Sequence, residues 1–343
     1  EAMNALPDPV LSAHDLSIGY ASLRRPPVVV AEHLSVALAP GELVCLVGPN
    51  GVGKSTLLRT LAAMQPALAG EVRLGGENLF ALDPRERARR MSVVLTERVD
   101  AGQMTAYALV ALGRHPYTDW TGRLSEHDES VVRWAIETVG AKALAGRPVA
   151  ELSDGERQKI MIARALAQEP LVMLLDEPTA FLDVPNRAEI MRVLRALTRL
   201  TGQAILLSTH DLDLALRSAD RLWLLPRGGS LMCGAPEDLV LSGALAATFQ
   251  TEGLVFDATT GTFALTAPRT DCVALAGQGL AALWTRRALE REGYCVVENS
   301  TLALCQVTVL ETEPPRWHLA RANVTQEHES IGALVTALRQ SLR

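Results

Sequence analysis

The sequence predicts an α/β fold in two parts, on three observations. Up to about Gln250, short apolar runs alternate with amphipathic helical patterns, as they do where parallel strands alternate with covering helices. A glycine-rich loop, Gly48 to Thr56, stands between a predicted strand and a predicted helix. Beyond Thr251 a second alternation begins, and 343 residues exceed one typical domain. We therefore expect a larger domain over residues 1–251 and a small C-terminal α/β domain over residues 252–343.

The elements of the first domain follow from its apolar runs. Three runs end in polar or glycine residues, as buried strands with functional carboxyl ends do. They are "ELVCLVG", "LVMLLDE" and "AILLSTH". The run "STLLRTLAAM" has its leucines on one helical face. The segment from Thr105 to Gly140 is helical in pattern and separates the strand groups, so we expect an inserted helical subdomain over about residues 98–165.

In the second domain we expect four strands and two helices. The strands are "CVALAG", "CVVE", "CQVTVL" and "RWHLARA", and the helices are "LAALWTRRALEREG" and "IGALVTALRQSL". The stretch "GQGLAA" follows a strand and opens a helix, which weakly resembles a dinucleotide-binding fingerprint. Only Glu298 stands near the place where that fingerprint needs an acidic residue. A packing domain without a ligand of its own is therefore the favoured interpretation.

The composition limits the classes of partner. Apolar residues make up 48% and charged residues 21%, which is typical of a globular protein. The formal charge of −6 argues against nucleic acid as a main partner, because phosphate-backbone binding needs a basic surface. The longest stretch without Asp, Glu, Lys or Arg is Cys272 to Thr285, 14 residues, so no membrane span is expected, nor is a secretory signal. The five cysteines are scattered without a CxxC, which predicts free, buried thiols.

The loop "GPNGVGKST" matches G-x-x-x-x-G-K-[ST] in the strand-loop-helix context that a phosphate-binding loop requires. Lys54 would supply a charge to the β and γ phosphates, and Ser55 would ligate Mg²⁺. Backbone N–H groups of the loop and the helix start would bind the phosphates. The nucleotide-binding residues predicted here are Gly48, Pro49, Asn50, Gly51, Val52, Gly53, Lys54, Ser55 and Thr56. The alternative is a glycine-rich turn with an exposed lysine.

Two further strand ends carry candidate catalytic residues. Asp176 and Glu177 follow "LVMLL", and we expect Asp176 to hold Mg²⁺ and Glu177 to polarise the attacking water. His210 ends "AILLSTH" and could contact the γ phosphate. The alternatives are a helix-capping or surface acidic pair, and a structural histidine.

The stretch "ELSDGERQKIMIARALA" opens a second helix with polar residues, and Ser153 and Glu156 have the spacing of a capping box. The run "LSDGERQK", followed by "LVMLLDEPTAFLD" and "STHD", closely resembles the signature motif, Walker B motif, D-loop and switch histidine of ATP-binding cassette (ABC) proteins. The resemblance covers about residues 10–250. It implies the nucleotide-binding-domain fold of P-loop NTPases with a helical subdomain.

The resemblance also implies a composite site. In that family two nucleotide domains pack head to tail, and the signature helix of one subunit caps the γ phosphate that the phosphate loop of the other holds. Residues that the resemblance assigns to the nucleotide are Tyr20, stacked on adenine, the signature residues Ser153, Asp154, Gly155 and Glu156, and Asp183 in the D-loop. Tyr20 could instead belong to the core.

Two departures from the family pattern add negative charge. Asp154 and Glu156 stand where the usual signature has a glycine and a glutamine. Glu97, in "LTER", stands where a glutamine usually senses Mg²⁺ and reports to the membrane partner. Because a carboxylate can ligate Mg²⁺, we expect Glu97 to join Ser55 and Asp176 as a metal ligand. Coupling to the membrane partner would then differ from the family's usual scheme.

The runs "VALGRHPYTDWTGRLSEHD" and "ADRLWLLPRGG" resemble ATPase subunits of importers for ferric siderophores, haem and cobalamin. This implies a homodimer that closes on two Mg-ATP, works with integral membrane permease subunits and a substrate-binding protein, and sits on the cytoplasmic face of the inner membrane. The C-terminal domain would be accessory, with a role in dimer contact or regulation. Two alternatives remain: a soluble cassette ATPase acting on cytosolic machinery, and a nucleotide-binding regulator without turnover.

Overall fold

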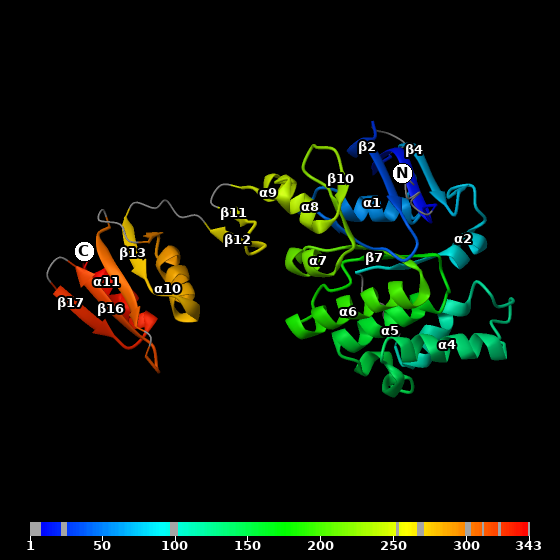
Figure 1. The fold of residues 1–343 in the computed structure, drawn as a ribbon. Coiled ribbons are helices and arrows are strands. Elements are labelled where there is room, and N and C mark those ends of the chain that lie inside the picture. The colour runs from blue at the N-terminus through cyan, green and yellow to red at the C-terminus, as the bar shows by residue number, and fades with distance from the viewer. Residues whose placement is uncertain are drawn as a thin grey trace, which may run out of the picture. The chain divides into compact units, whose positions relative to one another are not determined.

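The structure is a computed structural model that describes residues 8–21, 26–96, 102–251, 254–265, 271–298, 303–310, 312–321 and 324–341. The chain divides into two compact units, Glu1–Phe249 and Gln250–Arg343 (Figure 1). Across the described ranges, no helix is both long enough and apolar enough to cross a membrane.

The first unit begins with an antiparallel sheet, whose order in the described residues is β2-β1-β4-β5. Its strands are β1 (Leu11–Tyr20), β2 (Val28–Leu38), β4 (Ala69–Leu74) and β5 (Glu77–Asn78). In β2 the buried residues Leu34, Val36 and Leu38 alternate with exposed ones, so one face of this sheet packs inward. This sheet was not predicted from the sequence.

A second sheet of the same unit has the order β10-β9-β3-β8-β7-β6 in the described residues. Its strands are β3 (Leu43–Val47), β6 (Met91–Val94), β7 (Val172–Asp176), β8 (Ala204–Ser208), β9 (Arg221–Leu224) and β10 (Met232–Gly234). All pairs are parallel except that of β9 with β10. Every residue of β3, β7 and β8 is buried, which is why these strands form continuous apolar runs in the sequence. The three strands predicted for this domain are confirmed.

Nine helices belong to the described part of this unit: α1 (Lys54–Leu61), α2 (Pro84–Arg90), α3 (Ala106–Ala111), α4 (Glu126–Thr138), α5 (Asp154–Leu166), α6 (Val184–Thr201), α7 (Leu212–Ser218), α8 (Pro236–Leu241) and α9 (Ala244–Phe249). Short 3₁₀ turns lie at Leu112–Arg114, Lys142–Leu144 and Val149–Glu151. Figure 1 shows α1 and the N-terminal strands on one side of β7, with α4, α5 and α6 on the other. One apolar core joins both sheets through Leu57, Leu58 and Leu61 of α1.

The second unit contains a hairpin, β11 (Leu254–Asp257) with β12 (Thr262–Leu265), and a mixed sheet with the order β14-β13-β15-β16-β17 in its described residues. The sheet strands are β13 (Cys272–Ala276), β14 (Cys295–Val297), β15 (Cys305–Leu310), β16 (Arg316–Arg321) and β17 (Val324–His328). The helices are α10 (Gly279–Arg291) and α11 (Ile331–Ser341).

Both helices pack on one face of that sheet. Their buried residues Leu289 and Leu334 share a core with Val273 and Val307 of the sheet, and Trp317 Nε1 donates to Thr285 Oγ1 of α10 at 2.7 Å. The predicted strands and helices are confirmed. The hairpin and β17 were missed; four of the five β17 residues are exposed, so no apolar alternation marks that strand.

Candidate active site

The phosphate loop joins the buried strand β3 to helix α1, which begins at Lys54. Gly53 precedes the helix with a φ of 108°, and a Cβ there would come within 2.4 Å of Val30 Cγ1, so only glycine fits. No side chain caps the helix, and its first turn carries no acidic residue. The first N–H groups of α1 and the positive end of its dipole are therefore left for an anion to occupy.

Lys54 is held back over the loop rather than extended into solvent. Its Nζ donates to the carbonyls of Gly48 at 2.8 Å and Pro49 at 3.2 Å, and the residue is buried. Burial lowers the pKa of Lys54, while Glu177 and Asp176 oppose this shift. The structure thus places a partly desolvated positive charge beside the loop and two carboxylates, where it can meet phosphate oxygens without a large rearrangement.

Asp176, the last residue of β7, lies against the start of α1. Ser55 Oγ donates to Asp176 Oδ1 at 3.1 Å, and Ser208 Oγ donates to the same oxygen at 2.7 Å. The parallel pairing of β7 with β8 puts Asp176 directly beside Ser208. Thr96 Oγ1 donates to the Asp176 carbonyl at 2.7 Å and holds the strand end. Ser55 and Asp176, both predicted as metal ligands, are therefore brought together.

The protein atoms around Asp176 supply only some of the ligands that Mg²⁺ needs. Over the described ranges, no group of three or more His, Cys, Asp or Glu residues could hold a metal. Mg²⁺ is usually bound by one or two carboxylates together with substrate phosphates and waters, which one carboxylate and one hydroxyl beside a phosphate loop can satisfy. Glu97 lies outside the described residues, so its place relative to Ser55 and Asp176 stays a prediction.

Glu177 follows Asp176 in a strained conformation, with a φ of 48°. Its N–H donates to Ser208 Oγ at 2.9 Å, so Ser208 bonds to both members of the acidic pair. The Glu177 carboxylate lies 3.4 Å from His210 Nδ1, measured from Oε2. The two strand-end residues predicted as catalytic thus contact one another, and both side chains remain partly exposed.

Tyr20 ends β1 beside the same helix start. Its hydroxyl is hydrogen-bonded to Thr56 Oγ1 at 3.2 Å, and 55% of the residue is exposed. The alternative of a core tyrosine does not fit this exposure. The ring lies at the surface next to the phosphate loop, where a planar base could stack on it.

A second polar helix start lies at α5. Ser153 and Glu156 form the predicted capping box: Ser153 Oγ accepts from the Glu156 N–H at 3.3 Å, and Glu156 Oε2 accepts from the Ser153 N–H at 2.9 Å. Arg147 contacts Glu156 Oε1 at 3.1 Å, and Arg157 contacts Asp154 at 3.4 Å. The hydrogen bond from the Ser153 N–H is the main cause that lowers the pKa of Glu156. Both departures from the family signature are thus paired with arginines.

The α5 start and the D-loop are packed together. Asp183 caps α6 by accepting from the Asn186 N–H at 3.0 Å. A Cβ on Gly155 would come within 2.9 Å of the Asn186 side chain, so a glycine at this position allows α5 and α6 to approach. A groove lined by Asp154, Phe181 and Glu177, among others, connects this region to the acidic pair.

The two helix starts lie in different parts of the first unit. Helix α1 packs on β1, β7 and β8, whereas α5 packs on α3, α4, α6 and β6 (Figure 1).

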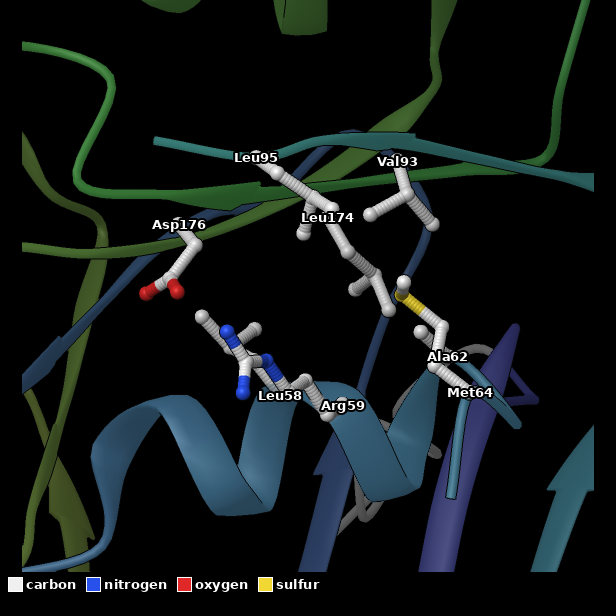
Figure 2. A pocket seen from close by; sticks show the side chains of 8 residues that line it. All are labelled: Leu58, Arg59, Ala62, Met64, Val93, Leu95, Leu174 and Asp176. Atoms are coloured by element: carbon white, nitrogen blue, oxygen red, sulfur yellow. The ribbon is translucent and has the colours of Figure 1, made fainter. Parts of the chain in front are cut away.

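Figure 2 shows a small pocket between α1 and the β6 and β7 strands, where the Arg59 guanidinium and the Asp176 carboxylate lie at the same end. Arg59 was not predicted as a site residue, because an arginine on an exposed helix turn has no distinctive sequence pattern.

Arg114 is a second residue that the sequence analysis missed, although it stands in the quoted run "VALGRHPY". It is only 1% exposed. Its guanidinium donates to Asp128 of α4 at 2.8 Å, to the Ala167 carbonyl at the end of α5 at 2.8 Å, and to Glu169 at 2.7 Å. It also lies over the Tyr117 ring, 3.9 Å from the centroid. Arg114 therefore fixes the carboxyl end of the helix whose amino end carries Ser153. The signal in the sequence that could have indicated Arg114 is a charged residue within an apolar helical run.

Comparison with known proteins identifies the class to which this fold and site belong. Residues 31–180 match the ABC transporter family, and residues 270–339 match the iron ABC transporter C-terminal domain. An uncharacterised ABC transporter ATP-binding protein of Methanocaldococcus jannaschii is 45% identical over 67% of this chain and 78% of its own length. The chain therefore belongs to the ATP-binding proteins of ABC transporters, and it is an ABC-family ATPase.

Further relatives agree with this class. The achromobactin transport ATP-binding protein of Dickeya dadantii is 39% identical over 69% of this chain and 86% of its own. The ferric enterobactin transport ATP-binding protein of Escherichia coli is 35% identical over 72% and 89%. A solved ATP-binding subunit of an ABC transporter matches with a TM-score of 0.58 and 26% identity, covering 71% of this chain and 95% of that one. The predicted fold class and the family resemblance are confirmed.

Proposed function

We propose that two copies of this chain close on two Mg-ATP and drive a separate membrane permease that imports ferric siderophores, haem or cobalamin. The observation that carries the proposal is the contact set at the carboxyl ends of β7 and β8, in which Asp176 bonds to Ser55 and Ser208 while Glu177 faces His210. These residues stand next to an uncapped helix start that suits phosphate. A second helix start, at Ser153, lies elsewhere in the unit and would serve the partner copy's nucleotide.

The proposed division of labour follows from the contacts. Lys54 would bind phosphate oxygens, Ser55 and Asp176 would hold Mg²⁺ with Glu97 as a further ligand, and bound Mg²⁺ would neutralise phosphate charge. Glu177 would take a proton from the attacking water. His210 would orient Glu177 and contact the γ phosphate.

The cargo class rests on relatives and on the second unit. Proteins similar to this chain include ATP-binding proteins named for achromobactin transport, iron(3+)-hydroxamate import and cobalamin import. The match of residues 270–339 to an iron ABC transporter C-terminal domain supports iron chelates within that set. We infer that the chain works at the cytoplasmic face of a membrane with permease subunits and a substrate-binding protein.

Glu177→Gln is the direct test of the catalytic assignment. We expect ATP binding to persist and hydrolysis to fall by about 10²-fold or more, because a general base contributes about 10²–10⁴-fold. Phosphate release should be measured with and without Mg²⁺, and ATP-bound dimer should accumulate on size-exclusion chromatography. Glu71→Gln, an exposed carboxylate of β4 paired with Arg73, is the matched control and should leave the rate unchanged. Hydrolysis at the wild-type rate in Glu177→Gln would remove Glu177 from the mechanism.

The second unit is proposed to be accessory, because every residue assigned to the nucleotide lies at or before His210. A chain ending at Thr251 should fold, bind ATP and hydrolyse it, with an altered basal rate or weaker self-association. Circular dichroism, ATP binding and sedimentation together measure these properties. A folded truncated chain that fails to bind ATP would contradict the assignment.

A further inference from the structure

The cysteines of the second unit do not share one environment. The sequence analysis predicted free, buried thiols for all five cysteines; Cys45 and Cys305 are buried, whereas Cys233, Cys272 and Cys295 are half-buried. The prediction of burial is therefore wrong for three of them. For Cys272 and Cys295 the reason is position, because each is the first residue of a strand, where the sheet ends and solvent reaches the side chain.

Cys272 and Cys295 are direct neighbours across two adjacent strands. They pair in register in the parallel ladder of β13 and β14, followed by Val273 with Val296. Register partners of a sheet point to the same face, and strands lie about 4.8 Å apart, within the Cα separation of about 4.4–6.8 Å that a disulfide spans. The side chains of the pair thus stand next to each other although 22 residues separate them in the sequence.

The remaining thiol of this sheet points the other way. Cys305 pairs with Val273, and both belong to the core beneath α10 and α11. Since side chains alternate along a strand, Cys272 lies on the opposite face from Val273 and therefore from Cys305. The arrangement selects one pair, Cys272 with Cys295, and leaves Cys305 out of it.

The edge position of β14 allows the pair to adjust. In the described part of the sheet, β14 has three residues and pairs with β13 alone. The Cys295 N–H donates to the Asp271 carbonyl at 2.8 Å, which keeps the two strand starts in register. A short edge strand can shift by the fraction of an ångström that closing two side chains needs, without disturbing the core on the other face.

We propose that Cys272 and Cys295 are a redox-active dithiol that a peroxide converts to an intramolecular disulfide and that thiol reductants restore. One of the two thiol sulfurs attacks one peroxide oxygen, the O–O bond breaks, and a sulfenic acid and one water result. The sulfur of the other cysteine then attacks the sulfenic sulfur, the S–O bond breaks, and a second water leaves. Two thiols and one hydrogen peroxide thus give one disulfide and two waters.

The two thiols interact directly with one another. Hydrogen bonding with Cys295 is the main cause that raises the pKa of Cys272, and the charge of Asp271 acts in the same direction. Either thiol can take the first step, because the same disulfide results. Burial raises the pKa of Cys45 to about 12 and that of Cys233 to about 11, which makes both poor competitors for the oxidant.

Peptide mapping of the full chain tests the pairing without any substitution. The reduced protein is treated with hydrogen peroxide, quenched with N-ethylmaleimide under denaturing conditions, digested and analysed by mass spectrometry. Trypsin alone leaves Cys295 and Cys305 on one peptide, because no Lys or Arg stands between them; cleavage after Glu298 separates them. We expect a disulfide-linked pair of peptides that contain Cys272 and Cys295, and dithiothreitol should reduce this link. The other three cysteines should carry maleimide.

Three results would overturn the proposal. Cys272 and Cys295 could both remain open to maleimide after peroxide, each could be oxidised singly to sulfinic acid, or the link could run to Cys305 or to a second chain. Native binding of phenylarsine oxide, which needs two adjacent thiols, is an independent measure and should be lost in Cys272→Ala and in Cys295→Ala. Cys233→Ala is the matched control and should retain it.

Discussion

Helices α1 and α5 of the first unit begin in opposite ways. Helix α1 starts after Gly53, with no capping side chain and no acidic residue in its first turn. Helix α5 starts after Ser153 with a full capping box and has Asp154 and Glu156 in its first turn. Unpaired N–H groups suit a phosphate, whereas N–H groups that already bond to a carboxylate do not.

The difference shows that the two helix starts are not equivalent anion sites within one chain. At α1, Lys54 is bonded to loop carbonyls and lies where it can meet phosphate. At α5, Arg147 and Arg157 are paired with the helix's own Glu156 and Asp154. A nucleotide would therefore bind first at α1, and α5 would act only when a second copy brings it to that bound nucleotide.

The largest expected effect concerns α1. Lys54→Ala in both copies should reduce ATP hydrolysis by about 10²–10³-fold, the usual cost of removing one group that stabilises transition-state charge. Ser153→Arg in both copies should also abolish most activity, because it blocks the α5 start. A heterodimer that pairs one Lys54→Ala copy with one Ser153→Arg copy places both lesions in a single composite site. It should retain more phosphate release than either mutant homodimer.

The control for this experiment is Lys142→Ala, an exposed lysine paired with Glu137, which should keep wild-type hydrolysis. A heterodimer no more active than the homodimers would mean either that the two sites must work together or that α5 does not act in trans. ATP-dependent dimer formation by the Ser153→Arg chain alone separates these cases, since only the second predicts that this chain dimerises normally.

Much of the α1 site could be predicted from the sequence because its chemistry is contiguous. The phosphate loop, Asp176 and Glu177 are short motifs at strand ends, and parallel strands bring such ends to one edge. The contacts of Ser208 with the Asp176 carboxylate and with the Glu177 backbone N–H could not be predicted, because they depend on β8 lying next to β7 in register. Strand order is a property of the whole sheet and leaves no local pattern.

The α5 region was predicted less completely for a physical reason. The capping box is local, so Ser153 and Glu156 could be paired from spacing alone. Arg114 acts through partners that come from α4 and from the end of α5, up to 55 residues away in the sequence. Burial of a charged group is stable only when several distant acceptors converge on it, and convergence of that kind is visible only in the folded chain.

The next largest effect concerns the far end of α5. Arg114→Lys keeps the charge but cannot reach three acceptors in different directions, so at least one buried acceptor loses its partner. We expect the free energy of unfolding of the first unit, measured by urea titration, to fall by about 1–3 kcal/mol. Arg133→Lys on α4 is the matched control; its pair with Glu129 is exposed, so a change of less than about 1 kcal/mol is expected. Equal stability of the two variants would show that Arg114 does not anchor α5.

The smallest expected effect separates charge from shape at the α5 start. Glu156→Gln keeps an oxygen that can accept from the Ser153 N–H but removes the negative charge. If the partner's γ phosphate approaches this helix start, repulsion is relieved and the KM for ATP should fall about two- to fivefold, the scale of a single charge at a helix end. Glu126→Gln makes the same change in the first turn of α4 and should leave the KM unaltered.

Arg147→Gln supplies the opposite perturbation, because it leaves Glu156 without its neutralising partner. The KM should then rise by a similar factor, and the double variant should return close to that of Glu156→Gln alone, since Arg147 has no charge left to balance. Steady-state hydrolysis over a range of ATP concentrations measures all four proteins. If neither single variant moves the KM, no phosphate comes near α5, and the difference between the two helix starts would be a matter of local helix stability alone.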